Sequence, residues 1–366
     1  MSEYQYYEFR TDGRVLDAND RKELKSLSSR AIVTSTQAIY TYSYGDFRYD
    51  CEEILADLCD AMLYVSNFGT RQLMFRLPLN LIEQSRIEPY CVPYVISYSI
   101  YEDSLILSLC INDENGDYGW IEGDGLLEDL IAIRSELLNG DFRALYLVWL
   151  AAAQFYQLED DDIEPPIPLG LKNLTSPQKA LISFFELMPG LAEIASELSP
   201  TEKLQASILE ELIHKLPEEE KTGFLLSLLA NEPDLKIKLQ RRLQLFIVSQ
   251  NQENSSPKRT VAQLLAAGEL AEKLRQEKLK EKQRAARVKE LKILAGKEPA
   301  LWQDVHNLIQ LKTKQGYDNA TKLLIDLKEL AVYLDQKELF ASKIRTIHQD
   351  YSSAAFKRRL YDNELI

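Results

Sequence analysis

The hydrophobic residues of the N-terminal part follow the two-residue period of β-strands. Between 71 and 77, Leu73, Phe75 and Leu77 alternate with residues that point the other way, and 105–112 alternates in the same manner. The pattern predicts strands at 4–10, 31–44, 71–77, 94–101 and 105–112, of which the last two form a hairpin across 102–104.

Helical spacing of apolar residues separates these strands. Asp50, followed by Glu53, starts one helix in the manner of a capping box, and its apolar stripe from Ile54 to Val65 continues until Gly69. Further helices are predicted at 17–28, 126–138 and 141–157. This order of elements predicts an α+β domain whose mostly antiparallel sheet carries its helices on one face.

From residue 166 onward the apolar spacing is that of helices alone. Ser176, Ser199 and Asn231 each precede a proline by one or two positions, which is typical of helix starts. We predict helices at 177–197, with a bend near Pro189-Gly190, and at 200–215, 217–230 and 233–248 and, nearer the C-terminus, at 299–315, 317–334, 336–350 and 352–361. The last four carry leucine and isoleucine stripes and form a small antiparallel stack.

One much longer helix is predicted between these two helical groups. It starts at the N-cap residue Ser256 and ends at Gly296, with Gly268 as its one interior glycine. A helix of this length spans roughly 55–60 Å. Its middle, 275–284, holds Leu279 as its one apolar residue. Because so polar a helix has no face to bury, we expect it to bridge two folded parts through solvent.

A run of acidic residues followed by prolines, 158–168, is a poor candidate for a helix or a central strand. We therefore place a domain boundary there. The predicted organisation is an α+β domain at 1–165, a helical domain at 166–250, a linker and the long basic helix at 251–297, and an antiparallel helical module at 298–366.

The charge of the chain is distributed unevenly. Its 366 residues carry a formal net charge of −14, which argues against a protein that binds nucleic acid or anionic membrane over its whole surface. Between 273 and 292, however, nine Lys and Arg outnumber three Asp and Glu, so this stretch carries +6 and the remainder −20. A basic helix is therefore expected between acidic parts.

The composition predicts a cytoplasmic protein. The apolar fraction of 45% is that of an ordinary soluble chain. The first residues lack the basic and apolar pattern of a signal peptide, and the longest apolar run, 144–153, is too short for a membrane span. Cys51, Cys59, Cys91 and Cys110 have no metal-binding spacing, which predicts reduced, buried thiols.

No stretch matches a known catalytic, metal-binding or nucleotide-binding motif. His214, His306 and His348 lie far apart, the acidic run 159–164 lacks the spacing of a calcium loop, and there is no glycine-rich phosphate loop. The sequence therefore predicts no metal, no cofactor and no catalytic residue. An enzyme site assembled from distant segments of the N-terminal domain stays open as an alternative.

Two surfaces are candidates for binding. Basic residues of the long helix are poorly paired with acids four positions away, which favours an external ligand, either nucleic-acid phosphates or an acidic protein surface; a solvated linker helix is the alternative. These basic residues are Lys273, Arg275, Lys278, Lys280, Lys282, Arg284, Arg287 and Lys289. Tyr40, Tyr42 and Tyr44 alternate along a predicted strand, so they share a face that would stack single-stranded bases, cover the core or form a protein interface.

Two parts of the chain resemble bacterial families. Residues 1–170 resemble a family of uncharacterised cytoplasmic proteins, on the motifs Tyr6-Tyr7-Glu8-Phe9-Arg10, Leu27-Ser28-Ser29-Arg30-Ala31, Tyr44-Gly45-Asp46-Phe47-Arg48 and Asn67-Phe68-Gly69-Thr70-Arg71. This resemblance implies no chemistry.

The segment 302–366 resembles the C-terminal helical part of SWIM zinc-finger proteins. The motifs are Trp302-x-x-Val305, Leu308-Ile309, Tyr317-x-x-Ala320, Leu323-Leu324-x-Asp326-Leu327 and Arg358-Arg359-Leu360. The CxC and CxH pairs of the finger are absent, so no zinc is implied. The resemblance implies an association with nucleic-acid processing.

These observations favour a non-enzymatic cytoplasmic adaptor or scaffold that joins macromolecular partners through its two ends. The first alternative is a nucleic-acid-associated component of a DNA- or RNA-processing assembly that uses the basic helix. The second is an enzyme with an unrecognised site in the N-terminal domain. A protein partner and no membrane are expected, and the sequence does not determine the oligomeric state.

Overall fold

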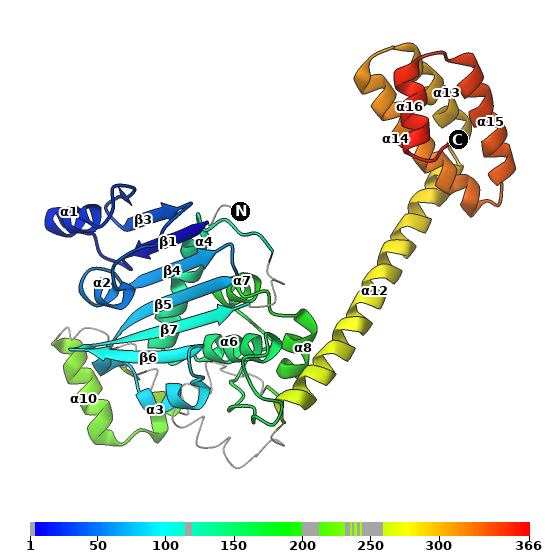
Figure 1. The fold of residues 1–366 in the computed structure, drawn as a ribbon. Coiled ribbons are helices and arrows are strands. Elements are labelled where there is room, and N and C mark those ends of the chain that lie inside the picture. The colour runs from blue at the N-terminus through cyan, green and yellow to red at the C-terminus, as the bar shows by residue number, and fades with distance from the viewer. Residues whose placement is uncertain are drawn as a thin grey trace. The chain divides into compact units, whose positions relative to one another are not determined.

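The N-terminal part of the chain is organised around one antiparallel sheet of seven strands (Figure 1). The computed structural model describes residues 4–113, 119–199, 212–230, 235, 238–239, 242–243 and 259–366. The strand order is β2-β3-β1-β4-β5-β7-β6. The strands are β1 (Gln5–Arg10), β2 (Ile32–Val33), β3 (Gln37–Tyr42), β4 (Ala61–Ser66), β5 (Thr70–Pro78), β6 (Ile96–Tyr101) and β7 (Ser104–Asn112).

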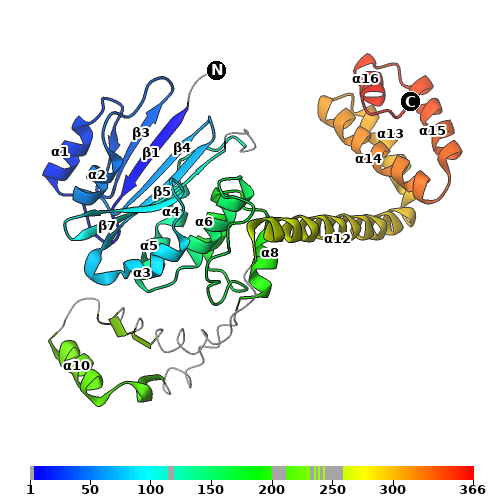
Figure 2. The same cartoon turned by 60° about the horizontal axis from the view of Figure 1, so that its bottom comes forward.

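Helices cover both faces of this sheet. The strand period of two sends Leu73 and Phe75 to one face and Met74 to the other. The first face packs under α4 (Leu126–Leu130), α5 (Ala132–Leu138), α6 (Arg143–Gln154), α7 (Ser176–Phe184) and α8 (Pro189–Glu197). The second packs under α1 (Ala18–Ser26) and α2 (Cys51–Asp57), as Figure 2 shows, while α3 (Gln84–Ile87) lies in the connection between β5 and β6. The predicted α+β class is confirmed, but the prediction of helices on one face alone is wrong.

The predicted helix beginning at 50 is correct only in its first half. Asp50 caps α2, which ends at Asp57, and Ala61–Ser66 forms the strand β4. β4 is hydrogen-bonded to β1 on one side and to β5 on the other. Ladder bonds on both sides outweigh the local helical spacing of apolar residues, since tertiary context overrides intrinsic propensity. The predicted strand 31–44 is likewise divided into β2 and β3.

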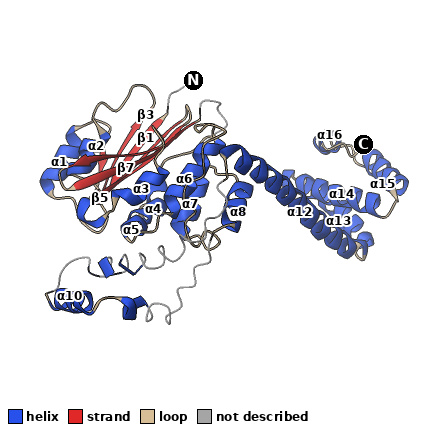
Figure 3. Cartoon of the chain, turned by 90° about the horizontal axis from the view of Figure 1, so that it is seen from below, coloured by secondary structure: helices blue, strands red, loops and turns tan. Residues whose placement is uncertain are grey.

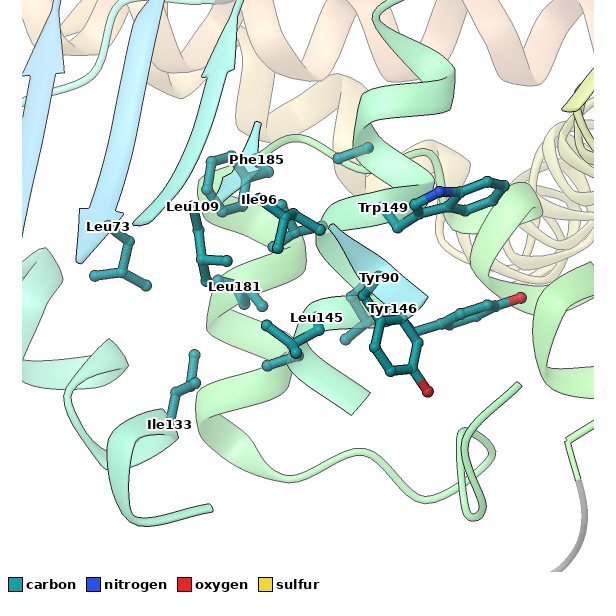
Figure 4. Packing of buried hydrophobic residues seen from close by; sticks show 14 of the residues in the cluster. Leu73, Tyr90, Ile96, Leu109, Ile133, Leu145, Tyr146, Trp149, Leu181 and Phe185 are labelled. Carbon is teal, nitrogen blue, oxygen red and sulfur yellow. The ribbon is translucent and has the colours of Figure 1, made fainter. Parts of the chain in front are cut away.

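Residues 166–195, predicted to begin a separate helical domain, share the core of the sheet. Leu181, Phe184 and Leu191 belong to the same buried cluster as the strand residues, and Figure 4 shows Leu181 and Phe185 beside Leu109 and Ile96. The expected helix 177–197 is two helices, because Glu186 adopts a left-handed conformation before α8. The predicted helix 217–230 is α10 (Glu218–Leu229). Most of the predicted 200–215 and 233–248 and all of the predicted linker 249–256 lie outside the described residues.

The acidic segment 159–164, where a domain boundary was predicted, is bound to the start of the long helix. That helix is α12 (Val261–Ala295), while its predicted N-cap Ser256 lies outside the described residues. Val261 N–H donates to the carbonyl of Asp162, and Ala262 N–H donates to that of Asp160. Backbone acceptors thus satisfy two donors that the first turn of a helix leaves unpaired, and the nearby carboxylates match the positive end of its dipole.

Two glycines let α8 cross α12 at close range. A Cβ on Gly190 would lie 2.5 Å from the backbone nitrogen of Glu272 and 2.6 Å from the carbonyl oxygen of Gly268. A Cβ on Gly268 would lie 2.9 Å from Leu191 Cδ1. A glycine inside a helix weakens it locally. At Gly268 the missing side chain allows the backbones of α8 and α12 to approach each other, which any side chain would block.

The chain divides inside α12 into two units, Met1–Lys273 and Leu274–Ile366. The second unit contains the end of α12 and the helices α13 (Glu298–Gln310), α14 (Lys314–Tyr333), α15 (Lys337–Asp350) and α16 (Ala354–Asp362), and its described elements are all helical (Figure 3). Its own buried cluster includes Trp302, Leu324 and Ile344. The four predicted C-terminal helices are confirmed to within three residues at the start and five at the end of each.

Candidate interaction surfaces

The middle of α12 is the most exposed regular element among the described residues. Every residue from 276 to 286 is exposed. Several predicted binding residues make no hydrogen bond or ion pair with any residue that the structure describes: Lys273, Lys278, Lys280, Lys282, Arg284 and Lys289. Their ammonium and guanidinium groups therefore face solvent and are available to an anionic ligand.

Arg287 and Arg275, two further predicted binding residues, are engaged within the protein. Arg287 donates to Asp326 on α14, to Glu290 at 3.0 Å and to Glu329 at 2.7 Å. These hydrogen bonds raise the pKa of Arg287 and fasten the end of α12 to α14. Arg275 is half-buried and also has a partner. The structure therefore leaves six of the eight predicted cations open to a ligand.

The predicted tyrosine face is not a common exposed surface. Tyr40 is fully buried, and its hydroxyl donates to the carbonyl of Leu24 at 2.7 Å. Tyr42 is half-buried beneath the guanidinium of Arg30, whose carbon lies 5.2 Å from the ring centre. Tyr44 lies beyond the end of β3 and is exposed. Two of the three rings thus pack against the second face of the sheet, the alternative in which they cover its core.

A neighbouring pair of tyrosines escaped the sequence prediction. Tyr7 on β1 and Tyr64 on β4 are directly opposite in register and stack with ring centres 4.4 Å apart. Both hydroxyls donate to Gln5 Oε1, at 2.8 and 3.1 Å. Burial raises the pKa of both phenols, so both stay neutral. The pairing of β1 with β4 is what brings the two tyrosines together. The sequence prediction missed this pairing because it assigned the residues of β4 to a helix.

A groove lies between α13 and α15 in the second unit. It has a volume of about 520 Å³ and is lined by Glu298, Pro299, Trp302, His306, Leu339, Lys343, Thr346 and Ile347. The lining residues follow helical spacing on each helix, so one face of α13 opposes one face of α15. Sequence analysis did not single out this groove, because both stripes look like ordinary core positions.

The polar part of the groove is built on one carboxylate. Glu298 Oε1 accepts from the Trp302 indole N–H at 3.0 Å and lies 3.1 Å from Lys343 Nζ. The Lys343 ammonium also lies 4.8 Å from the Trp302 ring centre, in cation–π geometry. On the rim, Leu339 is 48% exposed. An aromatic floor, a held cation and an exposed aliphatic rim together suit a protein side chain better than a small polar substrate.

Buried ionisable groups of the first unit are engaged in contacts that hold elements together. Asp60 accepts from the Asp12 backbone N–H and lies within ion-pair distance of Arg14, Arg76 and Arg134. Burial alone would raise the pKa of Asp60, but these donors lower it on balance.

A second buried carboxylate, Glu164, also holds two elements of the first unit together. It accepts from the Tyr146 hydroxyl and from Arg259 at 2.7 and 2.8 Å, which joins α6 to the start of α12. Coordinated in this way, Glu164 and Asp60 have the geometry of structural ion pairs rather than of an acid–base pair facing a substrate.

The thiols have the properties of unreactive side chains. Burial raises the pKa of Cys51 and Cys59 to about 12 and that of Cys110 to about 11, so each is a protonated thiol at neutral pH. All four cysteines are free, as expected, but of the four only Cys59 is buried: Cys51 and Cys110 are half-buried and Cys91 is exposed. Among the described residues no group of three or more His, Cys, Asp and Glu is placed to hold a metal ion.

Comparisons with known proteins find no relative for this chain: no family model, no curated protein and no solved structure matches it. The resemblances noted from the sequence therefore stay predictions. A separate search of the described helices finds none with the length and apolar character of a membrane span.

Proposed function

We propose that this protein is a non-enzymatic adaptor whose C-terminal helical unit holds a protein partner in the groove between α13 and α15. The observation that carries the proposal is the groove itself, where Lys343 and the exposed Leu339 lie beside the core residue Trp302. Binding hot spots are enriched in buried aromatic side chains such as tryptophan. Each unit has its own hydrophobic core. This supports the proposal that the sheet-bearing unit binds a second partner independently.

The fate of the ionisable groups adds support. Asp60 and Glu164 are bound by arginines, and the buried thiols are protonated at neutral pH. A general base or nucleophile needs an accessible group with a pKa suited to its task. Asp60 and Glu164 are instead paired with arginines that hold helices and strands together.

Leu339→Asp is expected to abolish capture of the groove's partner. A carboxylate on the apolar rim would have to be desolvated on binding, which lowers affinity at least about tenfold. The full-length protein and the variant serve as baits in the native cytosol, and captured proteins are quantified by mass spectrometry. A true groove partner is depleted at least about tenfold from the variant bait.

Leu311→Asp is the matched control. Leu311 is a 61% exposed leucine of the same unit and does not line the groove. A partner lost from both variants would depend on the net charge or the stability of the C-terminal unit. That result would contradict binding in the groove. If every captured protein binds Leu339→Asp as well as wild type, the groove has no role in the adaptor function.

The exposed cations of α12 favour a second candidate function, nucleic-acid binding. Six cationic side chains on one helix have no partner among the described residues. Lys and Arg that neutralise phosphates release counterions, so affinity falls steeply as salt rises. The charge distribution is also suitable: Leu274–Ile366 holds 19 Lys and Arg against 13 Asp and Glu, whereas Met1–Lys273 carries −20.

Neutralising four cations of α12 is expected to weaken nucleic-acid binding at least about tenfold. The variant is Lys278→Gln, Lys280→Gln, Lys282→Gln and Arg284→Gln combined, which keeps helix propensity almost unchanged. Fluorescence anisotropy with a labelled 20-base-pair duplex measures affinity between 50 and 200 mM salt. Wild-type affinity falls about a hundredfold over that range if about four phosphates are contacted.

A control with the same change of charge distinguishes the contribution of α12 to binding from that of the net charge of the second unit. It combines Lys312→Gln, Lys314→Gln, Lys337→Gln and Arg345→Gln, all exposed cations of the second unit outside α12. This control is expected to retain most of the binding. Equal loss in both variants would show that the net charge of the unit, and not the helix, attracts the ligand.

A further inference from the structure

The exposed stretch of α12 carries its cations in two stripes on opposite sides. Residues two positions apart on a helix lie about 200° apart around its axis, which is almost the opposite side. One stripe has the spacing i, i+4 and consists of Lys280 and Arg284. The other has the spacing i, i+4, i+11 and consists of Lys278, Lys282 and Lys289.

The two sectors between these stripes differ in charge. Between 276 and 289 one sector has no carboxylate and contains Gln276, Leu279, Gln283 and Ala286, and Glu290 lies on the same side directly after it. The opposite sector contains both acids of the stretch, Glu277 and Glu281, followed by Ala285. All of these side chains are exposed. Around its axis the helix therefore presents cations, uncharged groups, cations and acids in turn.

We infer that α12 binds in the major groove of double-stranded DNA, with the two cationic stripes toward the two phosphate backbones and the uncharged sector toward the base edges. This inference rests on the nucleic-acid function proposed above. An α-helix with side chains is about 10–12 Å across, and the major groove of B-form DNA is about 12 Å wide. The acids of the opposite sector then point away from the phosphates.

The sector pattern distinguishes this ligand from others. The major groove of an RNA duplex is deep and narrow, so side chains cannot reach its bases. A single strand offers one backbone and is held by aromatic stacking, whereas 276–286 contains no aromatic residue. An acidic protein surface would engage one stripe and leave the other unused. Glutamine and alanine, found in the uncharged sector, are side chains that contact adenine and the thymine methyl group.

Two adjacent substitutions test the orientation. Ala286→Glu places a carboxylate in the uncharged sector, and Ala285→Glu places the same carboxylate in the acidic sector one residue earlier. Both add one negative charge to an exposed helical position, and both positions start as alanine. Ala286→Glu is expected to weaken binding of a 20-base-pair DNA duplex at least about tenfold, and Ala285→Glu less than about threefold.

Anisotropy at 50 mM salt is measured for duplex DNA, duplex RNA and single-stranded DNA, with circular dichroism to verify equal helix content. Equal loss in the two variants overturns the proposed orientation. Equal wild-type affinity for single-stranded DNA or duplex RNA overturns the major-groove inference and leaves nucleic-acid binding in place. If no nucleic acid binds wild type at this salt, the inference and the second candidate function both fail.

Discussion

Asp60→Asn is expected to lower the unfolding free energy of the first unit by about 3–5 kcal/mol, because it leaves three arginines around a neutral side chain. The Asp60 side chain is 4% exposed, and its carboxylate lies 2.7 Å from Arg76, 3.1 Å from Arg14 and 3.8 Å from Arg134. Asp12, which also pairs with Arg134, would be the one acid left among them. Urea unfolding at neutral pH measures the loss.

The effect should also depend on pH in a defined direction. The pKa of Asp60 is lower in the folded protein, so its charge stabilises the fold above the unfolded pKa of about 3.9. That contribution is lost as pH falls through the folded pKa. The difference between wild type and Asp60→Asn is therefore constant above about pH 5 and shrinks below about pH 4.

Asp57→Asn provides the control for this prediction. Asp57 is an exposed carboxylate three residues earlier, at the end of α2, so its loss should change stability by less than about 0.5 kcal/mol. If the two variants were equally stable, the Asp60 cluster would contribute nothing beyond a surface charge. A difference that grew on acidification would show that the sign of the pKa shift is wrong.

Gly190→Ala is expected to destabilise the first unit by about 2–3 kcal/mol. The new Cβ would lie within 2.8 Å of three backbone atoms of Gly268 and Glu272, so no side-chain rotation relieves the clash. The hydrogen bond from Gly190 N–H to Glu272 Oε2, 3.0 Å long, would be strained as well. Urea unfolding measures the loss, and hydrogen exchange should place it in peptides of α8 and the first turns of α12.

Gly223→Ala is the matched substitution in α10. No atom lies within 4 Å of the Cβ position there, and alanine is the better helix former, so stability should rise by roughly 0.5–1 kcal/mol or stay unchanged. Opposite signs for the two alanines would demonstrate the close crossing of α8 and α12. Wild-type stability in Gly190→Ala would mean that the helices separate without cost.

The elements predicted best are those whose signal is local. Every second residue is apolar from 73 to 77 in β5 and from 105 to 111 in β7, and α14 and α15 carry clear apolar stripes, so each was found within a few residues. β4 was missed because its apolar residues also fit a helix, and its identity comes from β1 and β5 on either side. A domain boundary was predicted at the acidic segment 159–164 because nothing nearby in sequence reveals that Thr260 and Val261 bind it.

The candidate surfaces also divide into those with a local sequence signal and those formed by residues far apart in the sequence. The cations of α12 were identified from spacing alone, since a polar helix without an apolar stripe has no face to bury. The groove at Trp302 and Leu339 was not, because its two walls lie on helices separated by α14. Of the alternatives left open for the tyrosines, covering the core is the one found at Tyr40, whose burial depends on α1 lying over β3.

The sequence by itself determined the α+β class, the helical C-terminal unit and the exposed basic helix, because strand alternation, helix stripes and charge runs are properties of neighbouring residues. The tertiary structure alone decided that both faces of the sheet are covered, that Gly190 and Gly268 meet, and that Asp60 gathers three arginines. These contacts join residues 16 to 78 positions apart, such as Arg76 with Asp60 and Gly190 with Gly268. No local pattern specifies such pairs, since they form only when the whole chain packs.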